Sequence, residues 1–208
     1  MEVKTTDAKL LSIDSVSIII VNYNAGAMLT ECVSLGLEQA GEVVVVDNAS
    51  VDNSIKKLKL TFAKNPNLHI IKNNKNLGFA DACNIGSEAV MGEYLLFLNP
   101  DALLGDNSVE KLVNSFNFSP DVGVVGGLLI NPNGTEQAGG RRAIPTPWRS
   151  FVRAFGLSRF ENRWPILFYD FCLHKKPLPD KPIYVEAISG ACMMIKKEVM
   201  EEVGHWDK

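Results

Sequence analysis

Short apolar runs alternate with amphipathic stretches along most of the chain. A run that is continuously apolar, with no polar residue at every second position, is typical of a strand buried on both faces of a parallel sheet. Such runs predict strands at 16–21, 42–47, 68–71, 94–98 and 122–130. Apolar residues spaced by three and four predict helices between them, over about 28–39, 55–62, 79–90 and 109–116. Strands and helices that alternate in this way predict an α/β fold, with a mostly parallel sheet flanked by helices on both faces.

Three segments depart from this alternation. Residues 1–14 mix charges without an apolar face, so we expect a polar leader without fixed structure, followed by a single domain over 15–208. Prolines forbid a long helix between 139 and 182, and we expect this segment to be irregular and to face the acceptor side of any active site. Strand character returns over 183–195, and a short helix is predicted at 197–203.

Polar clusters follow three of the predicted strands. They are Asn22-Tyr23-Asn24, Asp47-Asn48 and Asn99-Pro100-Asp101. Asn and Asp favour turns, so each cluster, Asp101 included, can serve only to reverse the chain. The carboxyl ends of parallel strands, however, meet at one edge of the sheet, where ligands bind. Three clusters at one edge favour a nucleotide site, in which Asp101 holds Mg²⁺ or Mn²⁺ against phosphate oxygens.

Composition excludes several other classes of protein. The 208 residues carry a net charge of −3, which gives no general attraction to nucleic acid. The four cysteines form no CxxC motif and are expected to be buried thiols in a reducing, cytoplasmic compartment. No apolar run reaches the roughly 18 residues of a membrane span. GxGxxG, GxxxxGK[ST] and GxSxG motifs are absent, which argues against dinucleotide dehydrogenases, P-loop ATPases and serine hydrolases.

Taken together and in order, six motifs are far more specific than any one of them. The motifs are VSIIIVNYN at 16–24, VVDNAS at 45–50, NLGFA at 76–80 with NIG at 84–86, LFLNPDA at 96–102, SGACMMI at 189–195 and GHWD at 204–207. Over roughly residues 15–208 the chain resembles family 2 glycosyltransferases of the GT-A (Rossmann-like) fold. The closest likeness is to the rhamnosyltransferase-type branch of that family.

The resemblance implies an inverting transferase that uses a nucleotide-diphosphate sugar, with dTDP-rhamnose suggested by the branch, and a glycan or lipid-linked acceptor. It also implies a divalent cation, Mg²⁺ or Mn²⁺. The positions that bind the base in the family correspond to Asn22, Tyr23 and Asp47. The loop from Asn76 through Gly78 matches a segment near the donor.

The metal motif of the family corresponds to Asn99-Pro100-Asp101. Asp101 is the implied metal ligand. Asn99 replaces the first acid of the family's Asp-x-Asp motif, and because an amide is a weaker ligand, we expect Asn99 to contact the sugar or ribose. The family's usual general base lies in a Glu-Asp pair beyond Lys208 and is therefore absent from this sequence. Asp207 is the candidate catalytic base within the chain, and we expect this piece to bind donor but to turn over poorly.

Between 148 and 169 four arginines are interleaved with aromatic residues. This pattern is compatible with a solvated loop or a flap over the active site. That interpretation is favoured, and the alternative is a peripheral contact to anionic membrane lipid, at the inner face of the membrane, or to a lipid-linked acceptor. Nothing in the sequence sets an oligomeric state.

Two alternative functions remain open at this point. The first is a sugar nucleotidyltransferase, although the segment from Asn22 to Gly26 lacks the basic residues with which that class holds a triphosphate. The second is a nucleotide-sugar-binding domain without catalytic activity.

Overall fold

The computed structural model describes residues 13–161, 163–169, 173, 177–178 and 180–207. Within them, a six-stranded sheet has the order β3-β2-β1-β4-β8-β5. The strands are β1 (Val16–Asn22), β2 (Glu42–Asp47), β3 (Leu68–Lys72), β4 (Tyr94–Leu98), β5 (Val124–Gly126) and β8 (Cys192–Lys196). Strands β3, β2, β1 and β4 are mutually parallel, whereas β8 runs antiparallel to both β4 and β5. The predicted mostly parallel α/β sheet is therefore confirmed.

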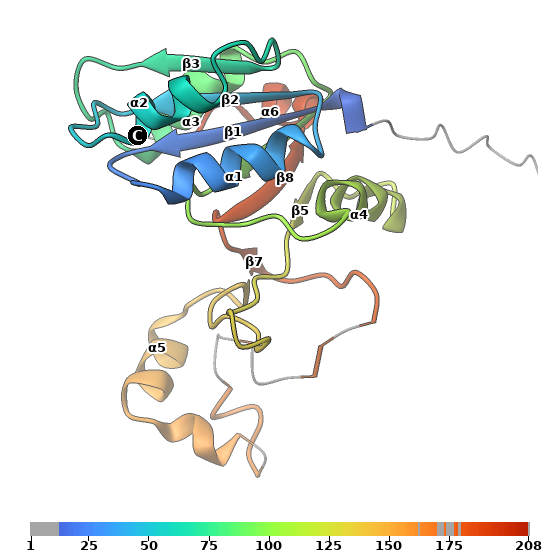
Figure 1. The fold of residues 1–208 in the computed structure, drawn as a ribbon. Helices are drawn as coiled ribbons and strands as arrows, with labels where there is room; N and C mark the ends of the chain where they lie inside the picture. The colour runs from blue at the N-terminus through green and yellow to red at the C-terminus, as the bar shows by residue number, and fades with distance from the viewer. Residues whose placement is uncertain (1–12, 162, 170–172, 174–176, 179, 208) are drawn as a thin grey trace, which may run out of the picture.

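Helices cover both faces of this sheet (Figure 1). On one face lie α1 (Met28–Leu37), α2 (Ser54–Thr61) and α4 (Ser108–Ser115), and on the other lie α3 (Phe79–Glu88) and α6 (Lys197–Val203). Every residue of β1 and β4 is buried, and successive side chains enter opposite cores: Ile18 packs in one cluster and Ile19 in the other. This double burial is the reason why these strands are apolar without alternation.

Helix α3 lies unusually close to the sheet. A Cβ atom added at Gly86 would stand 2.4 Å from Ile19 Cγ2 and 3.3 Å from Val46 Cγ2. Glycine at this position therefore allows the close approach of the helix to β1 and β2. Phe79 begins this helix at the rim of the sheet and is 48% exposed.

The last strands differ from the sequence prediction. The run at 122–130 supplies only the three residues of β5, and the run at 183–195 divides into β7 (Ala187–Ile188) and β8. A Cβ atom added at Gly126 would stand 2.9 Å from the side chain of Ile188, so glycine allows β5 and β7 to approach closely at this point. Strand β5 ends at Gly126. The Gly127 amide still donates to the Cys192 carbonyl at 2.9 Å, which marks the end of the pairing.

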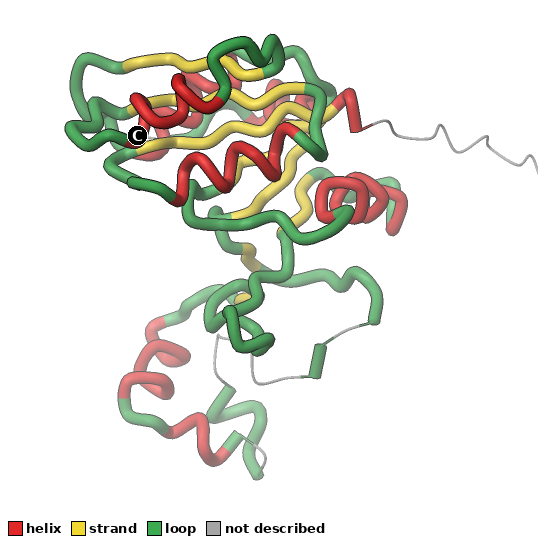
Figure 2. The backbone as a smooth tube through the Cα atoms, viewed as in Figure 1, coloured by secondary structure: helices red, strands yellow, loops and turns green. Residues whose placement is uncertain are grey.

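Between β5 and β8 the chain forms an appendage below the sheet, made mostly of loops (Figures 1 and 2). It contains β6 (Arg141–Arg142), which pairs with β7, as well as α5 (Pro147–Ala154) and the 3-10 turn η3 (Leu157–Phe160). Helix α5 forms despite the nearby prolines, because Pro147 occupies its first turn and Thr146 Oγ1 accepts from the Arg149 amide at 3.2 Å.

Among the described residues, the ion pairs Arg141–Glu136 and Arg149–Glu186 help to hold the appendage together. Arg141 makes a bidentate contact with Glu136, with N–O distances of 2.8 and 2.6 Å, and both side chains are largely shielded from water. Arg149 Nη1 lies 2.8 Å from Glu186 Oε2 and ties α5 to the segment that enters β7. The described part of the chain contains no helix with the length and apolar character that crossing a membrane requires.

Candidate functional site

The sheet brings the predicted polar clusters to one edge. Asn22 pairs with Asp47 in register, and Ile20 pairs with Leu98, so β1 ends between β2 and β4. Because adjacent strands lie about 4.8 Å apart, the ends of β2 and β4 are separated by about 10 Å. Tyr23 follows the central strand, with Asp47 on one side and the Asn99–Asp101 turn on the other. A single ligand the size of a sugar nucleotide can span this rim.

Asn22 is fully buried, and its side-chain amide donates hydrogen bonds to other side chains of the protein. Its Nδ2 lies 2.9 Å from Asp47 Oδ1, 2.9 Å from Ser50 Oγ and 3.0 Å from Ser54 Oγ. These contacts orient the carboxylate of Asp47, which is itself nearly buried. Among the described residues, no hydrogen bond reaches Asp47 Oδ2. One oxygen of Asp47 is thus without a partner in the described part of the chain, while direct contact of Asn22 with a base stays a prediction.

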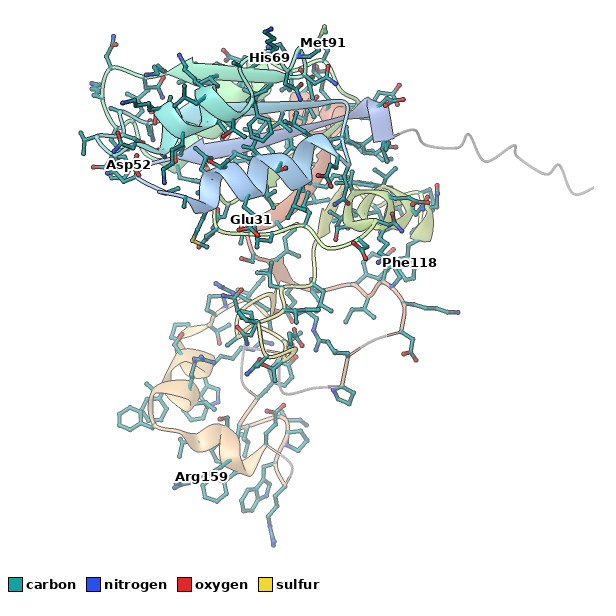
Figure 3. The ribbon with its side chains drawn as sticks, in the orientation of Figure 1. Glu31, Asp52, His69, Met91, Phe118 and Arg159 are labelled. Carbon is teal, nitrogen blue, oxygen red and sulfur yellow. The ribbon has the colours of Figure 1, made fainter. Side chains whose placement is uncertain are left out.

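The loop that carries Tyr23 is fastened to the loop after β2. Asn24, with a left-handed φ of 56°, accepts from the Val51 amide through its Oδ1 at 2.9 Å. Asp52 accepts from the Gly26 amide at 2.9 Å and from the Ser54 hydroxyl, and the Ser54 bond is the main reason why the pKa of Asp52 lies below its usual value. The Tyr23 side chain remains 55% exposed. Figure 3 labels Asp52 at this end of the sheet, opposite to His69 and Met91.

Asn48 anchors the predicted donor loop. It is buried, and its Nδ2 donates to Asn76 Oδ1 at 3.0 Å and to the Gly78 carbonyl at 2.9 Å. Its Oδ1 accepts from Asn73 Nδ2 at 3.0 Å and from the Leu77 amide at 3.2 Å. Asn76 and Gly78 are both exposed, so one buried amide fixes the position of an otherwise open loop.

Strand β4 ends in the Asn99-Pro100-Asp101 turn, which is fixed through the main chain of Asn99. The Asn99 amide donates to the Ala191 carbonyl at 2.9 Å, and the Asn99 carbonyl accepts from the Ala102 amide and the Cys32 thiol, at 3.0 and 3.5 Å. Burial, with a smaller contribution from the negative charge of Asp101, raises the pKa of Cys32 to about 12, so this thiol stays protonated as a donor.

The Asp101 carboxylate is exposed at the rim. The described residues contain no cluster of three or more His, Cys, Asp or Glu side chains that could enclose a metal ion. Mg²⁺ and Mn²⁺ do not need such a cage, because one or two carboxylates and the phosphate oxygens of a substrate suffice to hold them. A single exposed carboxylate next to a nucleotide-sized rim therefore fits a cation that binds together with its ligand.

A groove of about 360 Å³ adjoins the rim at Asp47. Its lining comes from the loop after β2, from α2 and from the end of β3, and comprises Asp47, Ser50, Asp52, Ile55, Lys56, Lys59, Leu60 and Lys72. Neither Tyr23 nor Asp101 lines it. The groove therefore extends from the Asp47 side of the rim toward β3, whereas Tyr23, Asn76, Gly78 and Asp101 are exposed outside it.

Asp207 follows a loop that is attached to α3. Asn84 Nδ2 donates to the Trp206 carbonyl at 3.0 Å, and Asn84 Oδ1 accepts from the Trp206 amide at 2.9 Å. The Trp206 ring packs edge-on against Phe97 of β4, with 5.3 Å between ring centroids. Asp207 itself is exposed, and the C-terminal end of the described chain lies at the same edge as the end of β1 (Figure 1).

Sequence analysis missed the supporting roles of Asn24, Asn48, Asp52 and Asn84. For Asn48 a signal exists, because a second amide directly after a strand-ending acid is available for the next loop. The partner of Asn84 lies 122 residues away, and no local pattern connects them.

Comparisons with known proteins agree with this architecture. The N-acetylglucosaminyl-diphospho-decaprenol L-rhamnosyltransferase of Mycobacterium tuberculosis (strain CDC 1551 / Oshkosh) is 24% identical, over 94% of this chain and 66% of that enzyme. The low-salt glycan biosynthesis hexosyltransferase Agl10 of Haloferax volcanii is 26% identical, over 93% of this chain and 56% of that protein. The chain thus spans between about half and two thirds of the length of these relatives.

A solved structure supports the fold independently. The mannosyltransferase PcManGT from Pyrobaculum calidifontis, in complex with GDP-Man and Mn²⁺, superposes with a TM-score of 0.63 at 20% identity, over 93% of this chain and 47% of that protein. The predicted GT-A fold is thereby confirmed. The family model for Glycosyl transferase family 2 matches residues 17–204, which include the whole rim, and the chain therefore belongs to this family.

Proposed function

We propose that the protein carries out metal-dependent, inverting transfer of a sugar from a nucleotide-diphosphate donor to a glycan or lipid-linked acceptor. The observation that carries the proposal is the shared rim, where Tyr23, Asp47 and Asp101 follow three adjacent parallel strands. Family membership and the relatives described above support a glycosyl transfer. The name of the mycobacterial relative supports a rhamnosyl donor such as dTDP-rhamnose.

The chain's own residues have distinct parts in donor binding. The exposed ring of Tyr23 offers a flat surface for the base, and Asp47 Oδ2 offers an acceptor for a base or ribose donor. Asn22 positions Asp47, and Asn48 positions the loop of Asn76 and Gly78 beside the donor. Asn99 is held by its main chain, and its side-chain amide, which has no hydrogen-bond partner among the described residues, can face the sugar or ribose.

Asp101 would hold a Mg²⁺ or Mn²⁺ ion, which neutralises charge on the diphosphate leaving group when it is bound. PcManGT was crystallised with Mn²⁺, which supports the choice of ion.

Inversion requires the acceptor hydroxyl to attack from the face opposite to the diphosphate. The new bond between the acceptor oxygen and the anomeric carbon forms as the bond from that carbon to the diphosphate breaks, and the hydroxyl proton passes to a base. Asp207 is the carboxylate that the described chain offers in the loop held by Asn84. Buried thiols at Cys32, Cys83 and Cys192 accord with a reducing, cytoplasmic compartment, which supports a reaction at that side of the membrane.

Calorimetry with UDP and dTDP, with and without Mn²⁺, tests the proposal. We expect binding that needs the metal and that weakens at least tenfold, about 1.4 kcal/mol, in the Asp101→Ala variant. Asp106→Ala is the matched control, because Asp106 is an exposed acid five residues further along the same segment. Metal-independent binding that survives Asp101→Ala would remove the role assigned to Asp101. Preferential use of a triphosphate, with release of pyrophosphate, would identify a nucleotidyltransferase instead.

A further inference from the structure

The appendage exposes an unusual number of aromatic rings. Along α5 and just beyond it, Trp148, Phe151 and Phe155 form a continuous row, with ring centroids 5.5 and 4.4 Å apart. Their exposed fractions are 51, 43 and 65%. The helix is nevertheless well anchored, because Val152 is fully buried beneath it. The row is therefore an outward face of a folded helix, and nothing in the described chain covers it.

A second aromatic row follows directly. Phe160, Trp164 and Phe168 contact one another, with centroid distances between 5.8 and 6.4 Å. Trp148 Nε1 donates to the Leu167 carbonyl at 2.7 Å and thereby joins the two rows. The rows thus belong to one surface, which we call the aromatic–arginine surface and define by Trp148, Phe151, Phe155, Phe160, Trp164, Arg159 and Arg163.

The charge of this region is opposite to that of the rest of the chain. Residues 141–169 contain six arginines and a single acidic residue, Glu161, whereas the whole chain carries a net charge of −3. Apolar rings within a basic segment fit a partner that is apolar beneath an anionic layer. An uncharged or basic partner would not need this excess of arginine.

The structure separates the arginines by what they contact. Arg149 is paired with Glu186 and is therefore already neutralised within the appendage. Arg159 lies over the ring of Phe160 at 4.8 Å, and Arg163 lies over the ring of Trp164 at 5.2 Å. Both are exposed, and Figure 3 labels Arg159 at the end of the appendage that lies far from the sheet. A guanidinium stacked on an exposed ring keeps its charge at the level where that ring meets its partner.

We propose that the aromatic–arginine surface binds the anionic surface of a lipid bilayer. Its rings enter the boundary between headgroups and acyl chains, and Arg159 and Arg163 contact lipid phosphates. The proposal concerns lipid binding alone, so it can fail or succeed independently of the transfer reaction. It also gives the appendage a distinct task, which is to hold the rim of the sheet near lipid-linked molecules.

Vesicle flotation tests this binding. The protein is mixed with phosphatidylcholine vesicles, either pure or with about 30% phosphatidylglycerol, at low and at physiological salt. We expect the protein to float with the anionic vesicles, less so as salt increases, and to float weakly with the neutral ones. At about 1 kcal/mol for each basic residue near the surface, the Arg159→Ser/Arg163→Ser variant should lose about 30-fold in partitioning.

Two control variants match these changes. Lys57→Ser/Lys64→Ser removes the same charge from exposed positions on and after α2, and it should bind as the wild type does. Phe155→Ser/Trp164→Ser tests insertion of the rings, and Val51→Ser/Met91→Ser removes exposed apolar side chains elsewhere. We expect only the first of these two apolar variants to lose binding. Circular dichroism and thermal unfolding establish that each variant is folded.

Failure to float with anionic vesicles at low salt would overturn the proposal. Equal partitioning of the Arg159→Ser/Arg163→Ser and Lys57→Ser/Lys64→Ser variants would overturn it as well. Sedimentation velocity, at the protein concentration used for flotation, measures whether the protein forms a dimer. A dimer that is lost in Phe155→Ser/Trp164→Ser, without vesicle binding in the wild type, would show that a second copy of the chain covers the surface.

Discussion

Replacement of Asn48 by alanine should loosen the donor loop and lower the stability of the protein. The buried amide makes two donor contacts, to Asn76 and Gly78, and two acceptor contacts, from Asn73 and Leu77. Alanine removes all four. Because alanine introduces no charged group, the decrease in the free energy of unfolding measures the contribution of the side-chain amide itself.

The size of the effect follows from where the partners lie. A hydrogen bond contributes about 1 kcal/mol net, so four bonds set an upper value of about 4 kcal/mol. All four partner residues are exposed or half-buried, so water can replace part of what is lost. We therefore expect Asn48→Ala to cost about 2–3 kcal/mol. At a urea m-value of about 2–3 kcal/mol/M for a chain of this size, the midpoint falls by about 1 M.

Equilibrium unfolding in urea measures this change, and hydrogen exchange of residues 73–78 shows whether the loop opens. Asn74→Ala is the matched control, since Asn74 is an exposed asparagine of the same loop whose side chain has no partner among the described residues. It should change stability by less than about 0.5 kcal/mol.

Asn48→Asp keeps the shape and the two acceptor contacts but loses both donors. At pH 7 the new carboxylate faces two oxygens, so this variant should be at least as unstable as Asn48→Ala. Protonation as the pH falls toward 5 returns one donor and should recover stability. If Asn48→Ala has the same urea midpoint as the wild type, the anchoring role assigned to Asn48 is wrong. The same holds if Asn48→Asp is as stable as the wild type at pH 7.

Three further predictions concern the rim and the core. Gly78 has a φ of 88° and a ψ of 173°, a conformation nearly restricted to glycine, so Gly78→Ala should cost about 1–3 kcal/mol although the space around it is open, as urea unfolding will show. Gly86→Ala should cost about 1–3 kcal/mol for a different reason, the clash with Ile19, and the same change should cost less when it is made in an Ile19→Ala background. Burial raises the pKa of Cys32 to about 12 and that of Cys192 to about 11, so both thiols should resist a thiol reagent at pH 8 until the protein unfolds. Because the unfolded thiols ionise near 9.0, this part of the stability is complete below pH 9 and is lost between pH 9 and 12, and thermal unfolding across that range measures it.

The parallel half of the sheet could be predicted because each strand carries its own signal. The run 94–98 is apolar at every position and the run 16–21 at every position except Ser17, which few structures other than a strand buried on both faces require. Once four such strands are parallel, the polar residues after them must share an edge. The prediction of a common rim followed from burial and topology, without any knowledge of contacts.

The antiparallel strands and the appendage were not predictable in the same way. Strand β8 lies between β4 and β5, although nearly a hundred residues separate it from β4, and no local feature encodes that insertion. The prolines near 145 read as helix breakers, yet Pro147 begins α5 because Thr146 caps it. At the start of α4 the Val109 amide donates to Oε1 of Gln39, a residue just after α1 and 70 positions away, at 3.3 Å, and no local pattern predicts this partner.

The place at which the appendage leaves and rejoins the sheet has a consequence for how such chains can vary. Strands β5 and β8 are adjacent, with Gly126 opposite Met193, so the excursion between them starts and finishes at neighbouring points of the same sheet. Closing a longer loop costs only about 0.6 kcal/mol for each doubling of its length. Related chains can therefore replace the appendage by a segment of different length and acquire a new docking partner. The register of the parallel strands β3, β2, β1 and β4 stays unchanged when they do so.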